Sequence, residues 1–236
     1  MKAFGVGVVF ALCCLSSAVS AETAQTPQPV KSAWPKMAPV AEYLIPRDAE
    51  IALARSSAPD SIAKDAEVMV FTKTGFQTAV KGTNGFVCLV ARSWSAGFGD
   101  PNFWNPKVRA PICYNALAAE SQVPETVKRT EVALAGGSES KIQEALKTAI
   151  SSGALPVAKP GSLSYMLSKG TYFNQGQGPW LPHLMFYVPQ TDLKNWGAGL
   201  PKSPIIGFEF PDERLTIFLV PVTRWSDGAV STGAPD

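Results

Sequence analysis

Two cysteines, Cys88 and Cys113, place the strongest constraint on how this 236-residue chain can fold. The other two, Cys13 and Cys14, lie in an N-terminal leader-like segment, so this pair is the one left in the body of the chain. An even pair in an oxidising compartment most simply forms one disulfide. Closing a loop of about 25 residues stabilises the folded state by roughly 3 kcal/mol. No Cys-x-x-Cys spacing favours a redox pair, so the sequence predicts a structural bridge between Cys88 and Cys113.

The first 21 residues have the pattern of a secretory signal peptide. Lys2 supplies a positive charge, an uncharged apolar run follows, and Val19-Ser20-Ala21 is a small-x-small cleavage pattern. The run is shorter than the roughly 20 apolar residues that span a bilayer. We therefore expect a mature chain that begins near Glu22, carries no membrane span and is periplasmic or secreted.

Composition predicts one folded domain between two flexible ends. Residues 22–36 are rich in Ala, Thr, Gln and Pro, and residues 226–236 in Gly, Ser and Pro, which is typical of tethers. Residues 37–225 are long enough for a single domain with a sizeable core. The net charge is +2, or +1 after loss of Lys2, with no basic cluster, which excludes an obvious nucleic-acid partner.

The periodicity of apolar residues predicts an α+β domain. Residues 67–72, 76–81 and 86–91 read as strands separated by turns at 73–75 and 82–85, which suggests an antiparallel three-stranded meander. A central helical section follows. Its clearest part is residues 140–152, where Ile142, Leu146 and Ile150 form an apolar stripe and Ser140 with Gln143 forms a capping box.

The C-terminal half returns to strands. Leu163, Tyr165 and Leu167 alternate with serines, which predicts a strand with one buried apolar face and one solvated serine face. Residues 183–188 read as a core strand, and residues 205–210 and 215–222 as a hairpin. The predicted fold class is a single α+β domain with a mostly antiparallel sheet and one disulfide.

A serine-nucleophile motif is the clearest sign of catalysis in the sequence, but the order of its elements along the chain argues against a catalytic role. Ser138-x-x-Lys141 resembles the nucleophile motif of penicillin-binding proteins and serine β-lactamases. In that family the Lys-Thr-Gly element follows the serine motif, whereas here the tripeptide that starts at Lys73 precedes it. A helix-capping serine explains Ser138 without any chemistry.

His183 is the single histidine, so any Ser-His or Cys-His site must use it. It opens an apolar strand, and a strand-end histidine with a backbone partner is the simpler interpretation. One histidine with scattered carboxylates does not make a zinc set. We therefore assign no catalytic residue, metal or cofactor from the sequence.

Two long aromatic loops are the remaining candidates for a site. Residues 93–111 hold Trp94 and Trp104, and residues 170–182 bring Tyr172 and Trp180 next to His183. Their rings could stack on a sugar or an apolar ligand, anchor a partner protein, or simply complete the core. The hypothesis is that the two loops converge near His183 and present Trp94, Trp104, Tyr172 and Trp180 to a ligand.

Two sequence blocks, residues 82–92 and 181–186, resemble segments of secreted bacterial proteins that have no assigned function. The resemblance extends loosely from about residue 50 to 225 and implies export but no activity. The sequence thus predicts an exported periplasmic binding or interaction module for an unknown small molecule, glycan or protein. The alternative is a periplasmic hydrolase that uses His183.

Overall fold

The computed structural model describes residues 32–173 and 181–232, which form one α+β domain built on an eight-stranded sheet. The strands are β1 (Glu67–Thr72), β2 (Gly75–Val80), β3 (Val87–Ala91), β4 (Ala110–Tyr114), β5 (Ser162–Met166), β6 (His183–Pro189), β7 (Ile206–Phe210) and β8 (Leu215–Pro221). Their order is β2-β1-β3-β4-β5-β6-β8-β7, and every neighbouring pair except β1 and β3 is antiparallel. The predicted fold class is confirmed.

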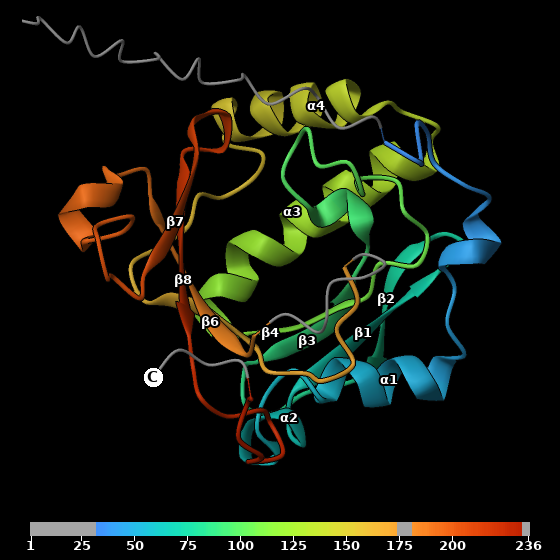
Figure 1. Cartoon of the computed structure of the whole chain (residues 1–236). Helices are drawn as coiled ribbons and strands as arrows, with labels where there is room; N and C mark the ends of the chain where they lie inside the picture. Colours follow the sequence, from blue (N-terminus) through green and yellow to red (C-terminus); the bar gives the residue numbers. More distant parts are fainter. Residues whose placement is uncertain (1–31, 174–180, 233–236) are drawn as a thin grey trace, which may run out of the picture. The chain divides into compact units, whose positions relative to one another are not determined.

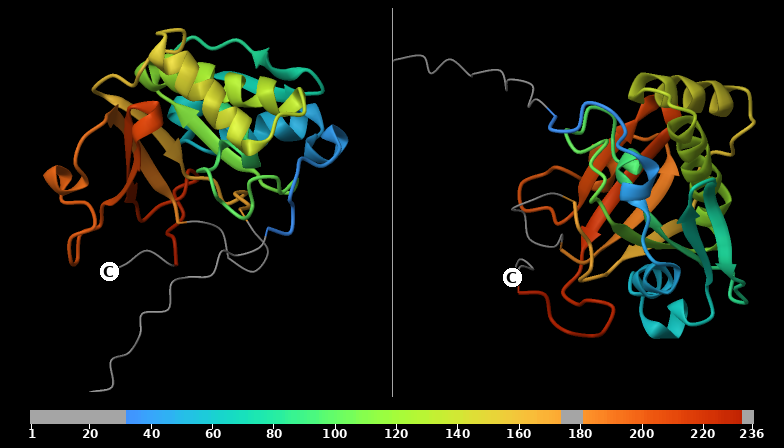
Figure 2. Two further views of the ribbon diagram at one scale, coloured as in Figure 1. Left: turned by 90° about the horizontal axis from the view of Figure 1, so that it is seen from above. Right: turned by 90° about the vertical axis from the view of Figure 1, so that its right-hand side faces the viewer.

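Helices cover both faces of this sheet (Figures 1 and 2). α3 (Ala116–Leu134) and α4 (Glu139–Ser151) lie on one side, and α1 (Arg47–Arg55) and α2 (Asp60–Ala63) on the other. The shorter 3₁₀ segments are η1 (Val40–Tyr43), η2 (Ser93–Ser95), η3 (Leu193–Trp196) and η4 (Pro211–Glu213).

The alternation of side chains along each strand divides the core into layers. Leu89 and Ile112 face α3, whereas Val68 and Val90 pack under α1 and α2. The predicted disulfide joins β3 to β4 in this second layer, where Cys88 and Cys113 are directly opposite each other and fully buried.

The predicted three-stranded meander is wrong in its third strand. β3 pairs with β1 in parallel and does not pair with β2. Residues 81–86 cross the start of β1, where Glu67 N donates to Phe86 O and Thr83 N to Asp65 O. A Cβ atom on Gly82 would lie 2.1 Å from Glu67 N, so only glycine permits this crossing. The crossing carries the chain to the far side of β1, which makes the third strand parallel.

The prediction that the serines of β5 face solvent is also wrong. Ser162 and Ser164 are buried toward α3, whereas Leu163 and Tyr165 on the opposite face are only half-buried. Ser164 Oγ lies 2.9 Å from Tyr187 Oη, within hydrogen-bonding distance. Burial of Ser164 is therefore possible because a tyrosine of β6 satisfies its hydroxyl, which alternation alone could not reveal.

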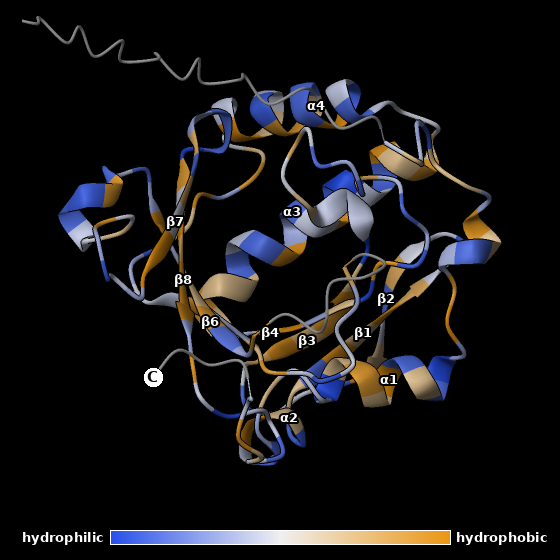
Figure 3. Ribbon diagram, viewed as in Figure 1, coloured by the Kyte–Doolittle hydropathy of each residue, from blue (hydrophilic) through white to orange (hydrophobic). Residues whose placement is uncertain are grey.

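α3 is the longest helix, and its apolar pattern is weak because it buries polar side chains. It turns Ser121, Gln122, Thr126, Arg129 and Thr130 inward and contains Pro124. α4 has the opposite character: Ile142, Leu146 and Ile150 are buried, as predicted, and its outer side is hydrophilic in Figure 3. The helix begins at Glu139, one residue earlier than predicted, and Ser138 rather than Ser140 is its N-cap.

We expect Leu146→Ala to lower the free energy of unfolding by about 2–5 kcal/mol, because the side chain is 1 % exposed and its removal leaves a cavity. Glu144→Ala, on the exposed side of the same helix, should change it by less than about 0.5 kcal/mol. Urea denaturation of the two variants measures both effects. Equal losses would contradict the orientation of α4.

The domain extends beyond the predicted range of residues 37–225. Trp34 packs against the aromatic core cluster, and Ser32 Oγ donates to Pro101 O at 2.6 Å. At the other end Ser231 N donates to Thr223 O, and Lys169 pairs with Asp227 at 2.6 Å. The described parts of the predicted lead and tail, residues 32–36 and 226–232, are therefore bonded to the domain.

Candidate functional site

A pocket of about 850 Å³ lies where four segments of the chain meet. Its lining comes from residues 32–37, the loop at 98–104, the turn between α3 and α4, and the first residues of α4. Aromatic side chains form one part of the lining, and hydroxyl, amide and charged groups form the other.

Apart from Trp34, the aromatic residues of the lining belong to the first of the two predicted loops. Phe103 and Trp104 meet edge to face at 4.9 Å, and Phe98 stacks obliquely on Phe103 at 5.8 Å. The Tyr43 hydroxyl donates to Trp104 O at 2.7 Å, which ties the loop to η1. Asp100 Oδ1 accepts from Asn102 N at 2.7 Å, a side-chain turn that holds an irregular backbone. The loop is therefore long but well braced.

The polar part is built around the N-terminus of α4. Ser138 Oγ accepts from Lys141 N at 3.3 Å, so the serine of the Ser-x-x-Lys motif is a helix cap. Glu139 accepts a short hydrogen bond from Gly99 N, which attaches the first turn of α4 to the aromatic loop. Gln143 Nε2 donates to Asp212 Oδ2 at 3.3 Å. Lys36 and Asp100 complete a lining of mixed charge.

Of the predicted site residues that the structure describes, only Trp104 lines this pocket, and it does so with 5 % of its surface exposed. Trp94 is fully buried, and its indole N–H donates to Thr130 Oγ1 at 2.9 Å. Tyr172 is half-buried and pairs through its backbone with Arg109. Trp180 lies outside the described residues, so convergence of the two loops stays a prediction.

His183 occupies the first position of β6, between Met166 of β5 and Pro221 of β8. It is 2 % exposed, and its Nδ1 lies 2.7 Å from Leu181 O. Burial lowers the pKa of the imidazole and is partly opposed by this backbone contact. The ring is therefore neutral at neutral pH and is not among the residues that line the pocket.

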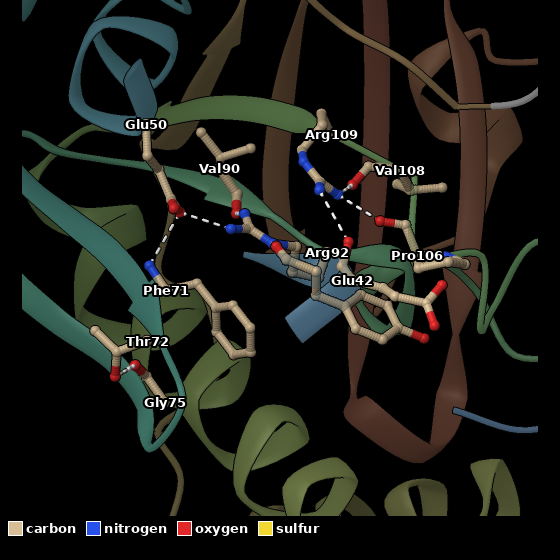
Figure 4. Close-up of polar contacts among 11 residues, drawn as sticks. Glu42, Glu50, Phe71, Thr72, Gly75, Val90, Arg92, Pro106, Val108 and Arg109 are labelled. Carbon is tan, nitrogen blue, oxygen red and sulfur yellow. Dashed lines mark hydrogen bonds and ion pairs between the residues drawn. The ribbon is translucent and has the colours of Figure 1, made fainter. Parts of the chain in front are cut away.

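A fully buried ion pair, for which the sequence gives no local signal, joins Arg92 to Glu50 of α1 (Figure 4). Arg92 Nη2 lies 2.9 Å from Glu50 Oε1, and both side chains are 0 % exposed. The guanidinium also donates to Tyr43 O and Val90 O and lies over the ring of Phe71. Burial lowers the pKa of Arg92 to about 10 against the opposing effect of Glu50, so the arginine stays charged.

Arg109 lies near this ion pair in Figure 4, folded over backbone carbonyls. Its Nη1 donates to Pro106 O and Val108 O, each at 2.7 Å. Burial lowers the pKa of this guanidinium, and Glu50 partly opposes that effect. The contacts fix the end of the aromatic loop where it enters β4.

A second buried charge cluster joins α3 to the β7–β8 hairpin. Arg129 Nε lies 2.9 Å from Glu125 Oε1, and Arg129 Nη2 lies 2.8 Å from Glu213 Oε1. Burial, followed by the charge of Glu125, raises the pKa of Glu213 to about 7, against the opposing effect of Arg129. No local sequence pattern indicates this pair, because Arg129 and Glu213 are 84 positions apart.

Within residues 32–173 and 181–232, no group of three or more His, Cys, Asp or Glu side chains gathers in a way that could hold a metal ion. Among the helices of the same residues, none has the length and apolarity to cross a membrane.

Comparison with known proteins found no matching protein-family model, curated protein or solved structure.

Proposed function

We propose that this protein is an exported binding module and that the pocket between the aromatic loop and α4 is its binding site. The observation that carries the proposal is the pocket itself, about 850 Å³ and lined by both aromatic and polar side chains. Pockets for small ligands are typically about 300–1,000 Å³ and combine apolar walls with a few polar groups that orient the ligand.

The chemistry of the lining favours a neutral ligand with one flat apolar face and a polar edge. Trp34 and Phe98 are half-buried, so part of each ring is open to a ligand. Ser140 and Lys36 offer donors, while Asp100 and Glu139 offer acceptors. A sugar ring stacked on an aromatic face with hydroxyls toward such groups has these properties, and so does a small aromatic compound with polar substituents.

The proposed location outside the cytoplasm, periplasmic or secreted, has two supports. The first 21 residues have the pattern of a signal peptide. The disulfide between Cys88 and Cys113 is of the kind that persists in oxidising compartments. The resemblance of residues 82–92 and 181–186 to secreted bacterial proteins agrees with this location.

The alternative, a hydrolase that uses His183, has less support. A general base must reach the proton that it removes from a bound substrate or water. His183 is 2 % exposed inside the sheet, and the pocket is lined by other residues.

We expect Trp34→Ala to weaken binding of a pocket probe about tenfold or more, which corresponds to about 1.4 kcal/mol. The probes are cellobiose, for the sugar class, and the uncharged N-phenyl-1-naphthylamine, for the aromatic class, measured by calorimetry and fluorescence. Loss of the Trp34 ring removes one stacking surface at the pocket.

Trp196→Ala is the matched control, because this tryptophan is 44 % exposed and lies outside the pocket. It should leave both affinities unchanged. Saturable binding of either probe that depends on Trp34 supports the proposal and tells the ligand class. Binding of neither probe, or equal losses in the two variants, would refute the pocket as the site.

A further inference from the structure

Arg129 connects the second buried charge cluster to the wall of the pocket. It is 4 % exposed, and its Nη1 donates to Trp94 O at 3.2 Å and to Ala96 O at 3.3 Å. Its guanidinium lies 4.7 Å from the centre of the Phe98 ring. Since Phe98 lines the pocket, the contact between this guanidinium and the ring stabilises one part of the pocket lining, called the Phe98 wall below.

The other wall is attached to the same hairpin. Asp212, the neighbour of Glu213 in η4, pairs with Lys147 of α4 at 2.9 Å and accepts from Gln143. Gln143 also lines the pocket. The two adjacent carboxylates of η4 are thus linked to different parts of the pocket lining. Glu213 binds Arg129, which contacts Phe98, and Asp212 binds Lys147 and Gln143 of α4.

Glu213 is the member of this cluster that can change its charge near neutral pH. The charged groups near it are Arg129 and Glu125 of α3 and Asp212 of η4, which is itself paired with Lys147 of α4. Burial and the two neighbouring carboxylates raise its pKa from 4.5 to about 7. The stability that this group contributes is fully present below about pH 4.5 and is lost as the pH rises through about 7.

We infer that the ion pair between Arg129 and Glu213 sets the position of the Phe98 wall, and that protonation of Glu213 weakens binding in the pocket. The inference rests on the proposed function. Protonation of Glu213 removes the attraction between its negative charge and the Arg129 guanidinium, and leaves a hydrogen bond from a charged donor to a neutral acceptor. A neutral Glu213 therefore holds Arg129 less firmly, and the loop carbonyls and the Phe98 ring lose a fixed support.

The test follows the wall directly by ¹⁹F NMR of the full chain with Phe98→4-fluorophenylalanine. Its chemical shift should titrate between about pH 5 and 9 with a midpoint near 7, and Glu213→Gln should abolish this titration. Over the same range, the affinity for the probe that binds should fall at least about fivefold on acidification, and only in the chain that keeps Glu213.

Glu125→Gln provides a second variant that does not remove the titrating group. The charge of Glu125 raises the pKa of Glu213, so its removal should move the ¹⁹F midpoint to lower pH. Asp212→Asn is a control with a smaller expected effect, because Asp212 is paired with Lys147 and contributes less to the raised pKa of Glu213. The ¹⁹F titration should persist in this variant with a slightly lower midpoint. This pair keeps the inference testable if Glu213→Gln does not fold.

A ¹⁹F shift that stays constant from about pH 5 to 9, or that titrates identically with and without Glu125, would overturn the inference. Probe binding that does not change with pH would also overturn it while leaving the binding function standing. A titrating wall without binding of any probe would instead contradict the proposed function alone.

Discussion

Arg92→Met is expected to lower the free energy of unfolding by about 3–5 kcal/mol, because it removes one partner of a fully buried ion pair. Glu50 would then be buried without the guanidinium that balances it. Its Oε2 already has no hydrogen-bond partner among the described residues. Its Oε1 would retain only the bond from Phe71 N at 2.9 Å. Urea denaturation at neutral pH measures the loss.

Removal of both charges should restore much of this stability. In Glu50→Leu/Arg92→Met no unpaired charge stays in the core, and buried ion pairs are often replaced by apolar residues at little loss. Lys128→Met, which breaks an ion pair with Glu131 at the surface, should change stability by less than about 1 kcal/mol. A double variant as unstable as Arg92→Met alone would show that packing, and not charge, causes the effect.

Trp94→Ala is expected to cost about 3–5 kcal/mol of folding free energy, as truncations of core tryptophans do. The ring is 0 % exposed and packs on Tyr43 at 4.9 Å and Phe71 at 5.5 Å between ring centres. Its loss also leaves the buried Thr130 hydroxyl without the indole donor. Thermal and urea denaturation give the magnitude.

Trp196→Ala is the control for this truncation. Trp196 stacks on Phe218 at 4.6 Å but is 44 % exposed, so its removal should cost no more than about 1.5 kcal/mol. A similar loss in both variants would mean that Trp94 is not the core residue that its burial indicates. A small loss of folding free energy for Trp94→Ala, together with altered probe binding, would instead support the prediction that Trp94 contacts a ligand.

The aromatic loop at residues 93–111 shows how much of the candidate site can be predicted from composition. Its length and its rings drew attention to a segment that lines part of the pocket, and its role in binding stays a proposal. Which ring faces the pocket depended on contacts with distant residues, because Thr130 accepts the indole N–H of Trp94 and draws that ring inward. Trp34, by contrast, lies in a segment whose composition suggested only a tether, and it lines the pocket.

Local patterns were sufficient for the strands, for α4 and for the disulfide. Strand and helix periodicities arise between residues a few positions apart, and the pairing of two cysteines in an oxidising compartment needs only their number. The side of β1 on which β3 lies, the inward serines of β5 and the ion pairs of Arg92 and Arg129 were decided by the tertiary structure. Each depends on groups brought together over 23, 42 or 84 positions, or on a backbone crossing that leaves no room for a side chain at Gly82. Such contacts have no local signal. A charge or a hydroxyl can be buried at low cost only when the fold supplies a partner from a distant part of the chain.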